Sequence, residues 1–283
     1  MTKIKLPRVS LNLIIIFFML VWILPTIGLL ITSFRPAGVV STSGWWTVFN
    51  SPLKFTQYTL ENYKDVLTTG GMATAFRNSF IISIVGTLLP VILASFAAFG
   101  LSRIKFRGRS FAYGLMVSLL VVPLQLTFIP ILRLYNMMGL SGSFAGLWLA
   151  HAGYGLPFAV FMLFNFFNSL PDDLFEAAYI DGASLWTAFY RLALPLSVPA
   201  LASLVIFQFL WVWNDLLVAL IYLGGFRSVA PLTMRLTSLV GSYGQSWHLL
   251  TSAAFISMFV PIIIFFSLQR YFVRGILAGS VKG

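Results

Sequence analysis

The sequence has 283 residues, of which 59% are hydrophobic and only 9% are charged, and its formal net charge is +11. Soluble domains average about half apolar and about a quarter charged residues, so this composition excludes an ordinary water-soluble fold. The absence of cysteine from the sequence also excludes disulfide bonds and thiolate metal sites.

Six apolar stretches follow one another along the chain, and each has roughly the 20 residues that a helix needs to cross a bilayer. They lie near residues 11–34, 78–101, 110–131, 144–167, 197–222 and 249–269. Their residues do not alternate between apolar and polar, as the strands of a transmembrane barrel do. The first stretch is longer than the core of a secretory signal and no cleavage pattern follows it, so we expect it to be retained. The sequence therefore predicts an all-α membrane protein with six transmembrane helices in a single domain over residues 1–283.

The basic residues indicate an orientation, because Lys and Arg beside a span are held on the cytoplasmic side. With both termini in the cytoplasm, the cytoplasmic segments hold eleven basic residues: Lys3, Lys5, Arg8, Arg103, Lys105, Arg107, Arg109, Arg191, Arg270, Arg274 and Lys282. The other seven are spread over longer external segments, which include the loops 35–72 and 223–248. We interpret the run from Arg103 to Arg109 as insertion anchors in contact with anionic lipid. Short clusters beside apolar spans do not suit a nucleic-acid surface, so no nucleic-acid partner is expected.

Residues 169–195, between the fourth and fifth spans, carry the signals of a short helix at the membrane surface. Ser169 can cap this helix and Pro171 suits its first turn. Asp172 and Asp173 favour the same N-terminus, because carboxylates are stabilised by the positive end of the helix dipole. A helix is therefore predicted to begin here.

A glycine and a second capping residue divide this segment. Gly182 is placed to end the first helix after Asp181. Ser184 can cap a second helix over residues 185–192, before Pro195 interrupts the chain. The sequence thus predicts a helix, a turn and a second helix.

The first of these helices is unusually acidic. Four of the seven acidic residues of the chain fall within it or directly after it: Asp172, Asp173, Glu176 and Asp181. The apolar residues between them would let the helix dock into a groove on a soluble protein. The alternative is a helix lying on lipid, but such helices usually carry Lys and Arg on their polar face. We therefore favour a protein partner.

The same segment resembles the EAA loop of ABC importer permeases. Its pattern is Glu176-Ala177-Ala178, three residues, Gly182, nine residues, Leu192, one residue and then Leu194-Pro195. The usual residue at the position of Leu192 is Ile, and the exchange keeps size and polarity. The resemblance implies a helix seated in a cleft of a partner ATPase. The coupling residues that it implies are Asp173, Glu176, Ala177, Ala178, Asp181, Gly182 and Ala183.

The resemblance extends over most of the chain, and it is to the carbohydrate-uptake branch, specifically the maltose-type second permease. It rests on five further segments, residues 60–63, 77–79, 181–184, 213–215 and 278–283. It implies the type I ABC importer permease fold in the bacterial cytoplasmic (inner) membrane. The implied partners are a second permease subunit, two ATPase subunits, an external sugar-binding protein, membrane lipid and the sugar. ATP and Mg would be bound by the ATPase, and no cofactor is expected on this chain.

The same resemblance implies two further contact regions. The C-terminal tail is expected to reach the ATPase through Gly279 and Lys282. Residues of the second external loop are expected to contact the binding protein, namely Ser242, Tyr243, Gly244 and Gln245.

Polar residues inside apolar spans need a partner or water, because an unsatisfied polar group is costly there. Four of them are candidates for the translocation path: Gln125, Gln208, Asn214 and Asp215. Asp215 either lines the path or ties its helix to a neighbour or a gate, and we favour the second interpretation. His151 and His248 lie far apart in the sequence, so a histidine-centred metal or acid–base site is not expected.

The chain lacks a phosphate-binding glycine loop followed by Lys and Ser or Thr, so ATP hydrolysis must belong to a partner. The predicted function is a permease subunit, not an enzyme, of an ATP-driven, binding-protein-dependent importer for a carbohydrate. One alternative is a self-sufficient secondary transporter, but repeated halves and intramembrane charges are not evident. Another is an ABC permease for glycerol-phosphate or another polyol. The sequence leaves the identity of the sugar open.

Overall fold

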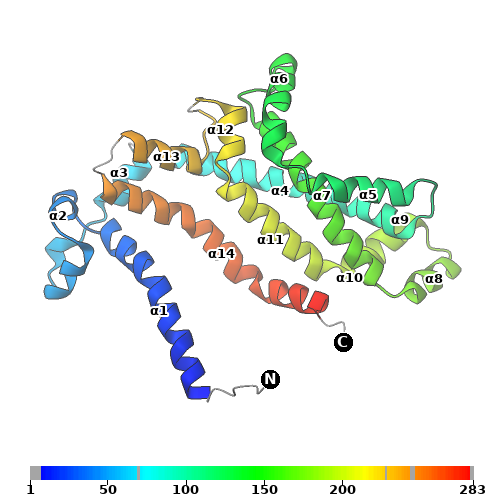
Figure 1. The fold of residues 1–283 in the computed structure, drawn as a ribbon, viewed down its shortest axis with the longest axis horizontal. Coiled ribbons are helices and arrows are strands. Elements are labelled where there is room, and N and C mark those ends of the chain that lie inside the picture. Colours follow the sequence, from blue (N-terminus) through cyan, green and yellow to red (C-terminus); the bar gives the residue numbers. More distant parts are fainter. Residues whose placement is uncertain (1–7, 69–70, 227, 243–245, 281–283) are drawn as a thin grey trace, which may run out of the picture. The chain divides into compact units, whose positions relative to one another are not determined.

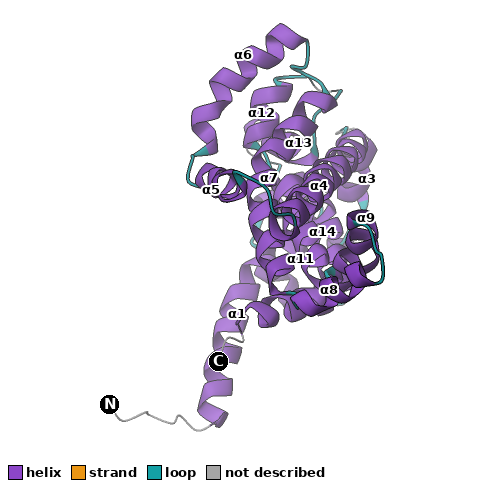
Figure 2. Cartoon of the chain, turned by 90° about the vertical axis from the view of Figure 1, so that its right-hand side faces the viewer, coloured by secondary structure: helices purple, strands orange, loops and turns teal. Residues whose placement is uncertain are grey.

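The computed structural model describes residues 8–68, 71–226, 228–242 and 246–280. Within these ranges every regular element is a helix, as Figure 2 shows, and the prediction of an all-α fold is confirmed. Four helices are long and apolar enough to cross a membrane: α1 (Arg8–Ser33), α4 (Met72–Arg103), α7 (Phe144–Ser169) and α14 (Trp247–Ser280) (Figure 1). Two bent helix pairs, residues 109–119 with 124–138 and residues 185–196 with 198–214, raise this number to six if each pair forms one span.

The third predicted span, residues 110–131, is broken in the structure. α5 (Arg109–Leu119) ends early, and a 3-10 turn, η3 (Leu124–Thr127), leads into α6 (Phe128–Met138). The segment 124–138 is bent by 94° relative to α5. Pro123 lies directly before η3. Because proline has no amide hydrogen and disfavours a helical conformation in the residue before it, the first helix cannot run on into the second.

The fifth predicted span, residues 197–222, is also two helices. α11 (Val198–Asn214) ends at Asp215, whose backbone is extended. The carboxylate of Asp215 accepts hydrogen bonds from the amides of Val218 at 3.2 Å and Ala219 at 3.0 Å. It therefore stabilises the first turn of a separate helix, α12 (Leu217–Leu223).

The chain forms two compact units, and the first comprises residues 1–73 and 235–259. The predicted external loop 35–72 contains short helices here: α2 (Ala37–Thr42), η1 (Trp45–Asn50), η2 (Phe55–Gln57) and α3 (Glu61–Thr68). The buried Arg35 holds this loop to the end of α1. Its guanidinium donates to the carbonyl of Gly44 at 2.8 Å and to the hydroxyls of Ser43 and Thr47 at 2.8 and 2.9 Å.

The second unit comprises residues 74–234 and 260–283. Its central helix is α7, which packs against α5, α11 and α12. One end of the unit has an aromatic core that includes Phe99, Phe167, Phe175 and Phe189. Phe175 and Phe189 belong to the segment 169–195, so this segment supplies part of the core.

Polar side chains near the start of α4 hold residues 228–232 of the predicted loop 223–248. The amide of Asn78 donates to the carbonyls of Ser228 and Ala230 at 2.9 and 3.1 Å, and the hydroxyl of Ser79 accepts from the amide of Leu232 at 2.8 Å. Leu232 begins α13 (Leu232–Ser242), so part of this loop is helical.

Candidate coupling site

The first helix of the segment 169–195 is α8 (Asp172–Ile180), and it ends as the sequence predicts. Gly182 has a φ of +81°, in the left-handed region where glycine is favoured. Its amide donates to the carbonyl of Tyr179 at 3.1 Å, and the amide of Ala183 donates to that of Ala178 at 2.9 Å. This pair of hydrogen bonds is a Schellman motif, which satisfies carbonyls at the end of the helix.

The second helix begins where it was predicted and runs further. The hydroxyl of Ser184 accepts from the amide of Thr187 at 3.2 Å and caps α9 (Leu185–Ala188). The helix then passes through a π-helical turn, η4 (Phe189–Ala193), into α10 (Leu194–Leu196). Pro195 falls within this continuous run and does not end the helix, and the π-helical turn η4 lies directly before α10. The chain bends by 74° between Leu196 and Val198.

The predicted role of Ser169 as a cap of α8 is wrong. Its hydroxyl donates to the carbonyl of Phe166 at 2.7 Å, within α7. Pro171 occupies the position directly before α8, and no side chain caps this N-terminus. The carboxylates of Asp172 and Asp173 lie in the first turn instead, where the helix dipole favours negative charge.

The faces of α8 differ in burial. Phe175 is 3% exposed and packs into the aromatic core. Most of the other side chains face outward, including the apolar Leu174, Tyr179 and Ile180, of which Ile180 is 86% exposed. Of the residues predicted to couple, Asp173, Glu176, Ala177, Asp181 and Gly182 are exposed, and Ala178 and Ala183 are half-buried. The outward face thus combines carboxylates with uncovered apolar surface.

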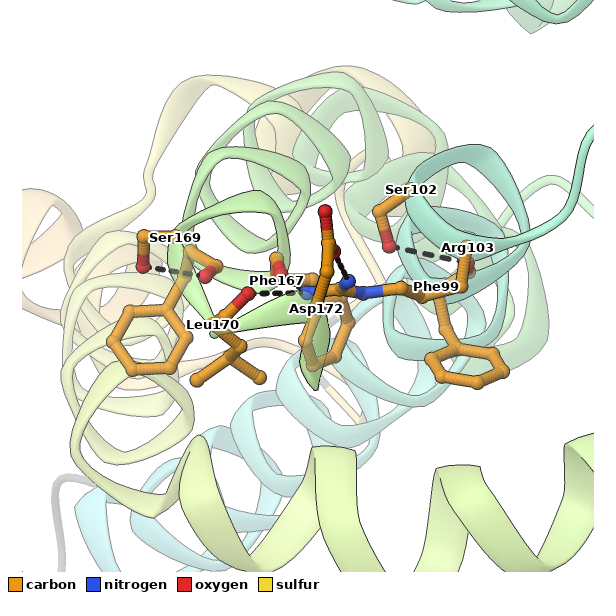
Figure 3. Close-up of polar contacts among 8 residues, drawn as sticks. Phe99, Ser102, Arg103, Phe167, Ser169, Leu170 and Asp172 are labelled. Atoms are coloured by element: carbon orange, nitrogen blue, oxygen red, sulfur yellow. Dashed lines mark hydrogen bonds and ion pairs between the residues drawn. The ribbon is translucent and has the colours of Figure 1, made fainter. Parts of the chain in front are cut away.

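Arg103, the last residue of α4, connects α8 to the long helices, as Figure 3 shows. Its guanidinium forms an ion pair with Asp172 and donates to the main-chain carbonyls of Phe167 and Leu170. It also lies over the ring of Phe175, 4.0 Å from the centroid. The side chain of Arg103 is 8% exposed, so the prediction that this residue is a lipid-contacting anchor is wrong. Arg103 is surrounded by protein groups that lie far from it in the sequence.

A cavity of about 600 Å³ lies among α5, η3, α6, α7 and α11. The polar or aromatic side chains in its wall include Thr127, Tyr135, Tyr154, Gln208 and Trp211. The hydroxyls of Thr127 and Tyr154 are 2.8 Å apart and hydrogen-bonded. None of the described residues that line the cavity is charged. A neutral ligand with hydroxyl groups suits such a wall, and the volume lies within the range of about 300–1,000 Å³ typical of small-molecule sites.

Of the four predicted path residues, the structure places Gln208 in the wall of this cavity. Gln125 has an exposed side chain in η3 and is not among the lining residues. Asn214 is exposed and its amide donates to the carbonyl of Leu210 at 2.8 Å. Asp215 stabilises α12, and one carboxylate oxygen lies 3.8 Å from Nε2 of the buried His151. The four side chains therefore do not form one cluster.

The structure does not show the side-chain surroundings of the remaining predicted contact residues. Tyr243, Gly244, Gln245 and Lys282 lie outside the described residues. Ser242 and Gly279 fall within α13 and α14, but the surroundings of their side-chain positions lie outside the described part.

Residues 86–278 match the family described as binding-protein-dependent transport system inner membrane component. The chain belongs to this family. Because the family consists of membrane transport components, the chain is a permease subunit of the inner membrane and not an enzyme, as predicted.

Two relatives show how similar this permease is to other members. It is 55% identical over 278 residues to the osmoprotective compounds uptake permease protein of Synechocystis sp., covering 98% of this chain and 92% of the relative. It is 49% identical to the alpha-glucoside transport system permease protein of Rhizobium meliloti, covering 80% of this chain and 61% of the relative.

A solved structure establishes the ABC importer permease fold. The permease resembles a chain of a bacterial ABC transporter involved in the import of the acidic polysaccharide alginate, with a TM-score of 0.78 and 21% identity. The likeness covers 94% of this chain and 96% of the other.

Proposed function

We propose that this permease is one of two membrane subunits of an ATP-driven importer, and that α8 transmits ATP-driven closure of two ATPase subunits to it. The observation that carries this proposal is the outward face of α8, where carboxylates stand beside the exposed Leu174, Tyr179 and Ile180. Exposed apolar patches rimmed by polar residues typically mark interaction sites. Carboxylates repel an anionic lipid surface, so a protein groove is the better partner for this face.

The proposal gives each part of the segment a physical role. Ala177 and Ala178 are small and allow the ATPase surface to approach the helix closely. Gly182 supplies the left-handed turn that separates α8 from α9. The carboxylates of Asp173, Glu176 and Asp181, with Ala183, complete the contact surface. Gly279 and Lys282 add a second contact, and ATP and Mg are bound by the ATPase and not by this chain.

The proposed topology places both chain ends in the cytoplasm. The six spans are then α1, α4, the bent pair α5 and α6, α7, the bent pair α9–α10 and α11, and α14. This arrangement puts α8 on the same side of the membrane as the basic residues near Arg103, as the positive-inside rule favours. The loops 35–72 and 223–248 then face outward, where residues around Tyr243 contact a sugar-binding protein.

The proposed substrate is a neutral carbohydrate. The cavity wall offers Tyr135, Tyr154 and Trp211 for stacking and Thr127 and Gln208 for hydrogen bonds to hydroxyl groups. The relative that transports alpha-glucosides supports this class. A neutral osmoprotective compound with several hydroxyl groups is the second candidate, since a relative that is 55% identical is named for osmoprotective compounds.

The coupling proposal is tested by purifying the tagged chain in mild detergent and identifying the proteins that co-purify by mass spectrometry. The wild type is expected to bring an ATPase and a second permease. The double variant Glu176→Lys, Gly182→Asp should lose the ATPase, because it reverses a charge on the exposed face and forces a side chain into the left-handed turn. The matched control is Glu61→Lys, Gly38→Asp, which makes the same changes at exposed positions of the first loop and should keep both partners.

A different result would overturn the proposal. A chain that purifies alone or as a homo-oligomer, and transports in vesicles without ATP, would indicate a secondary transporter. If that uptake depended on an ion gradient, the protein would be an ion-coupled secondary transporter.

The substrate proposal is tested by uptake in cells that carry the wild-type importer. Radiolabelled maltose, sucrose and glycerol are the first probes, with radiolabelled glycerol 3-phosphate as the charged comparison. Gln208→Ala should reduce uptake and leave co-purification of the ATPase unchanged, whereas Gln125→Ala should change neither. Uptake of the phosphate in preference to every neutral probe would contradict the assignment.

A further inference from the structure

Three helix ends meet at Arg103. α4 ends at this residue, α7 ends at Ser169 and α8 begins at Asp172. From the end of α4, the guanidinium contacts the other two ends (Figure 3). We propose that Arg103 is a positioning residue, a joint that carries movement of α8 into α4 and α7. This inference rests on the proposed function of α8, and it assigns a coupling role to a residue far outside the segment 169–195.

The contacts of Arg103 use the shape of the guanidinium. Nη1 pairs with the carboxylate of Asp172, and Nη2 donates to the carbonyl of Phe167 and, at 2.8 Å, to that of Leu170. A planar guanidinium presents its donors in a fixed fork and can serve these directions together. A lysine ammonium is a compact charge on a flexible stem and does not reproduce the fork.

Both helix ends gain from this bridge. Carbonyls in the last turn of a helix lack their usual partners four residues further on. At the end of α7 the carbonyl of Phe167 accepts from the amide of Leu170 at 3.3 Å, and Arg103 adds donors to the carbonyls of Phe167 and Leu170. Positive charge is favourable at that end, and negative charge at Asp172 is favourable at the start of α8. The single bridge therefore fixes the end of one helix to the start of the next.

α8 is also held by Phe175 and by the turn that leads into α9. Phe175 is its buried side chain, and the ring lies under the guanidinium of Arg103. The same aromatic core contains Phe99 of α4 and Phe167 of α7, whose rings meet edge to face at 6.1 Å. A load applied to α8 therefore reaches α4 and α7 through Phe175 and Arg103, besides the main chain at Leu170 and at the turn into α9.

The competing interpretation is that Arg103 serves membrane insertion, as its basic neighbours do. Lys105 and Arg107 are exposed, whereas the side chain of Arg103 is 8% exposed and has protein partners. Removal of Arg107 therefore provides a matched control, because it deletes a positive charge from the same loop without touching the joint.

The test uses the assembled importer in lipid vesicles and two spin labels on the permease. Because the natural chain has no cysteine, Lys105→Cys and Tyr179→Cys place the two labels at defined sites of this subunit. The first site follows α4 and the second lies on α8. The distance between the labels is measured with and without ATP and Mg by pulsed electron paramagnetic resonance, alongside co-purification of the ATPase.

With Arg103 present, the distance is expected to be narrow and unchanged by ATP, because α4 and α8 move together. Arg103→Met should broaden the distribution about twofold and make it respond to ATP, since α8 then keeps mainly Phe175 as an anchor. Arg103→Lys keeps the positive charge that favours insertion and should give a distance distribution of intermediate width. If Arg103→Met does not accumulate in the membrane, Arg103→Lys provides the test of the joint. Arg107→Met should match the wild type.

Two outcomes would overturn the proposal. The first is a narrow, ATP-independent distance in Arg103→Met and Arg103→Lys, and the second is loss of the ATPase from both variants, which would place Arg103 in assembly. Failure of the proposed function of α8 is separate. It is shown by retention of the ATPase in the Glu176→Lys, Gly182→Asp variant, whatever the labels report.

Discussion

The substitution Gly182→Ala tests the turn that ends α8. Its expected cost comes from the backbone conformation of this residue alone. The φ of Gly182 is +81°, and a residue with a Cβ loses about 1–2 kcal/mol in the left-handed region. A Cβ at this position would meet no atom within 4 Å, so no clash adds to this cost. The local opening equilibrium of the turn should therefore shift by about 5–30-fold, at 1.4 kcal/mol for each factor of ten.

Hydrogen exchange of the permease in detergent measures this opening, because local opening exposes protected amides. The amides to follow are those of residues 182 and 183, which donate to the carbonyls of Tyr179 and Ala178. Gly182→Asn should lose less protection, since Asn tolerates the left-handed region better than Ala. The control is Gly100→Ala, a helical glycine of α4 with open space at the Cβ position, where Ala should stabilise by about 0.5–1 kcal/mol.

Two results would refute this reasoning about Gly182. Equal protection in the wild type and Gly182→Ala would mean that the left-handed turn does not form. A loss far beyond about thirtyfold would mean that the new methyl group meets an obstacle. The same variant can be studied in the assembled importer. If Gly182→Ala weakens binding of the ATPase by more than the conformational cost explains, residue 182 contacts the ATPase.

The expected size of the effect of each further substitution follows from how deeply the side chain is buried. Phe175→Ala should release α8 at a cost of about 3–5 kcal/mol, detected as proteolysis within residues 171–184, whereas Leu174→Ala on the exposed face should leave cleavage unchanged. Asn78→Ala removes the donor from two loop carbonyls and should cost about 1–3 kcal/mol, seen as faster hydrogen exchange at residues 228–232. Asn165→Ala is its control, since that exposed amide bonds within its own helix, and slow exchange in both variants would contradict the role of Asn78. Asp172→Asn should cost less than about 1 kcal/mol because its side chain is 80% exposed. If hydrogen exchange of α8 rises as much as in Arg103→Met, the ion pair and not the carbonyl contacts holds the joint.

Hydrophobicity and length located the long helices but not their interruptions. α1, α4, α7 and α14 lie on four of the six predicted stretches, since a long apolar run without charges fixes a helix well. The break at Pro123 has a local signal, but the apolar residues on both sides hide it from a search for long spans. The break at Asp215 depends on a carboxylate that stabilises the next helix. Hydrophobicity averaged over a window of residues does not detect the effect of one such side chain.

In the candidate site, too, residues that act on near neighbours in the sequence could be predicted, and residues with distant partners could not. Gly182 and Ser184 act on residues within five positions, so their roles could be predicted from spacing. Arg103 could not be assigned, because Asp172, Phe167 and Leu170 lie 69, 64 and 67 residues further along the chain. A signal was present in the sequence: carboxylates and basic residues were both predicted on the cytoplasmic side, which favours pairing without naming the pair.

The uneven attachment of α8 has a mechanical consequence. Its start is held by Arg103 and Phe175, whereas its far end presents Ile180, which is 86% exposed, and then the turn at Gly182. Nine helical residues at about 1.5 Å each separate the two ends by about 13 Å. If the ATPase grips the exposed face, a displacement there turns the helix about its fixed start, and a rigid helix transmits the turn without absorbing it. The proposed coupling thus needs both a firm joint at Arg103 and an exposed outer face, and a variant that loosens the joint should separate ATP hydrolysis from transport while leaving the docking face intact.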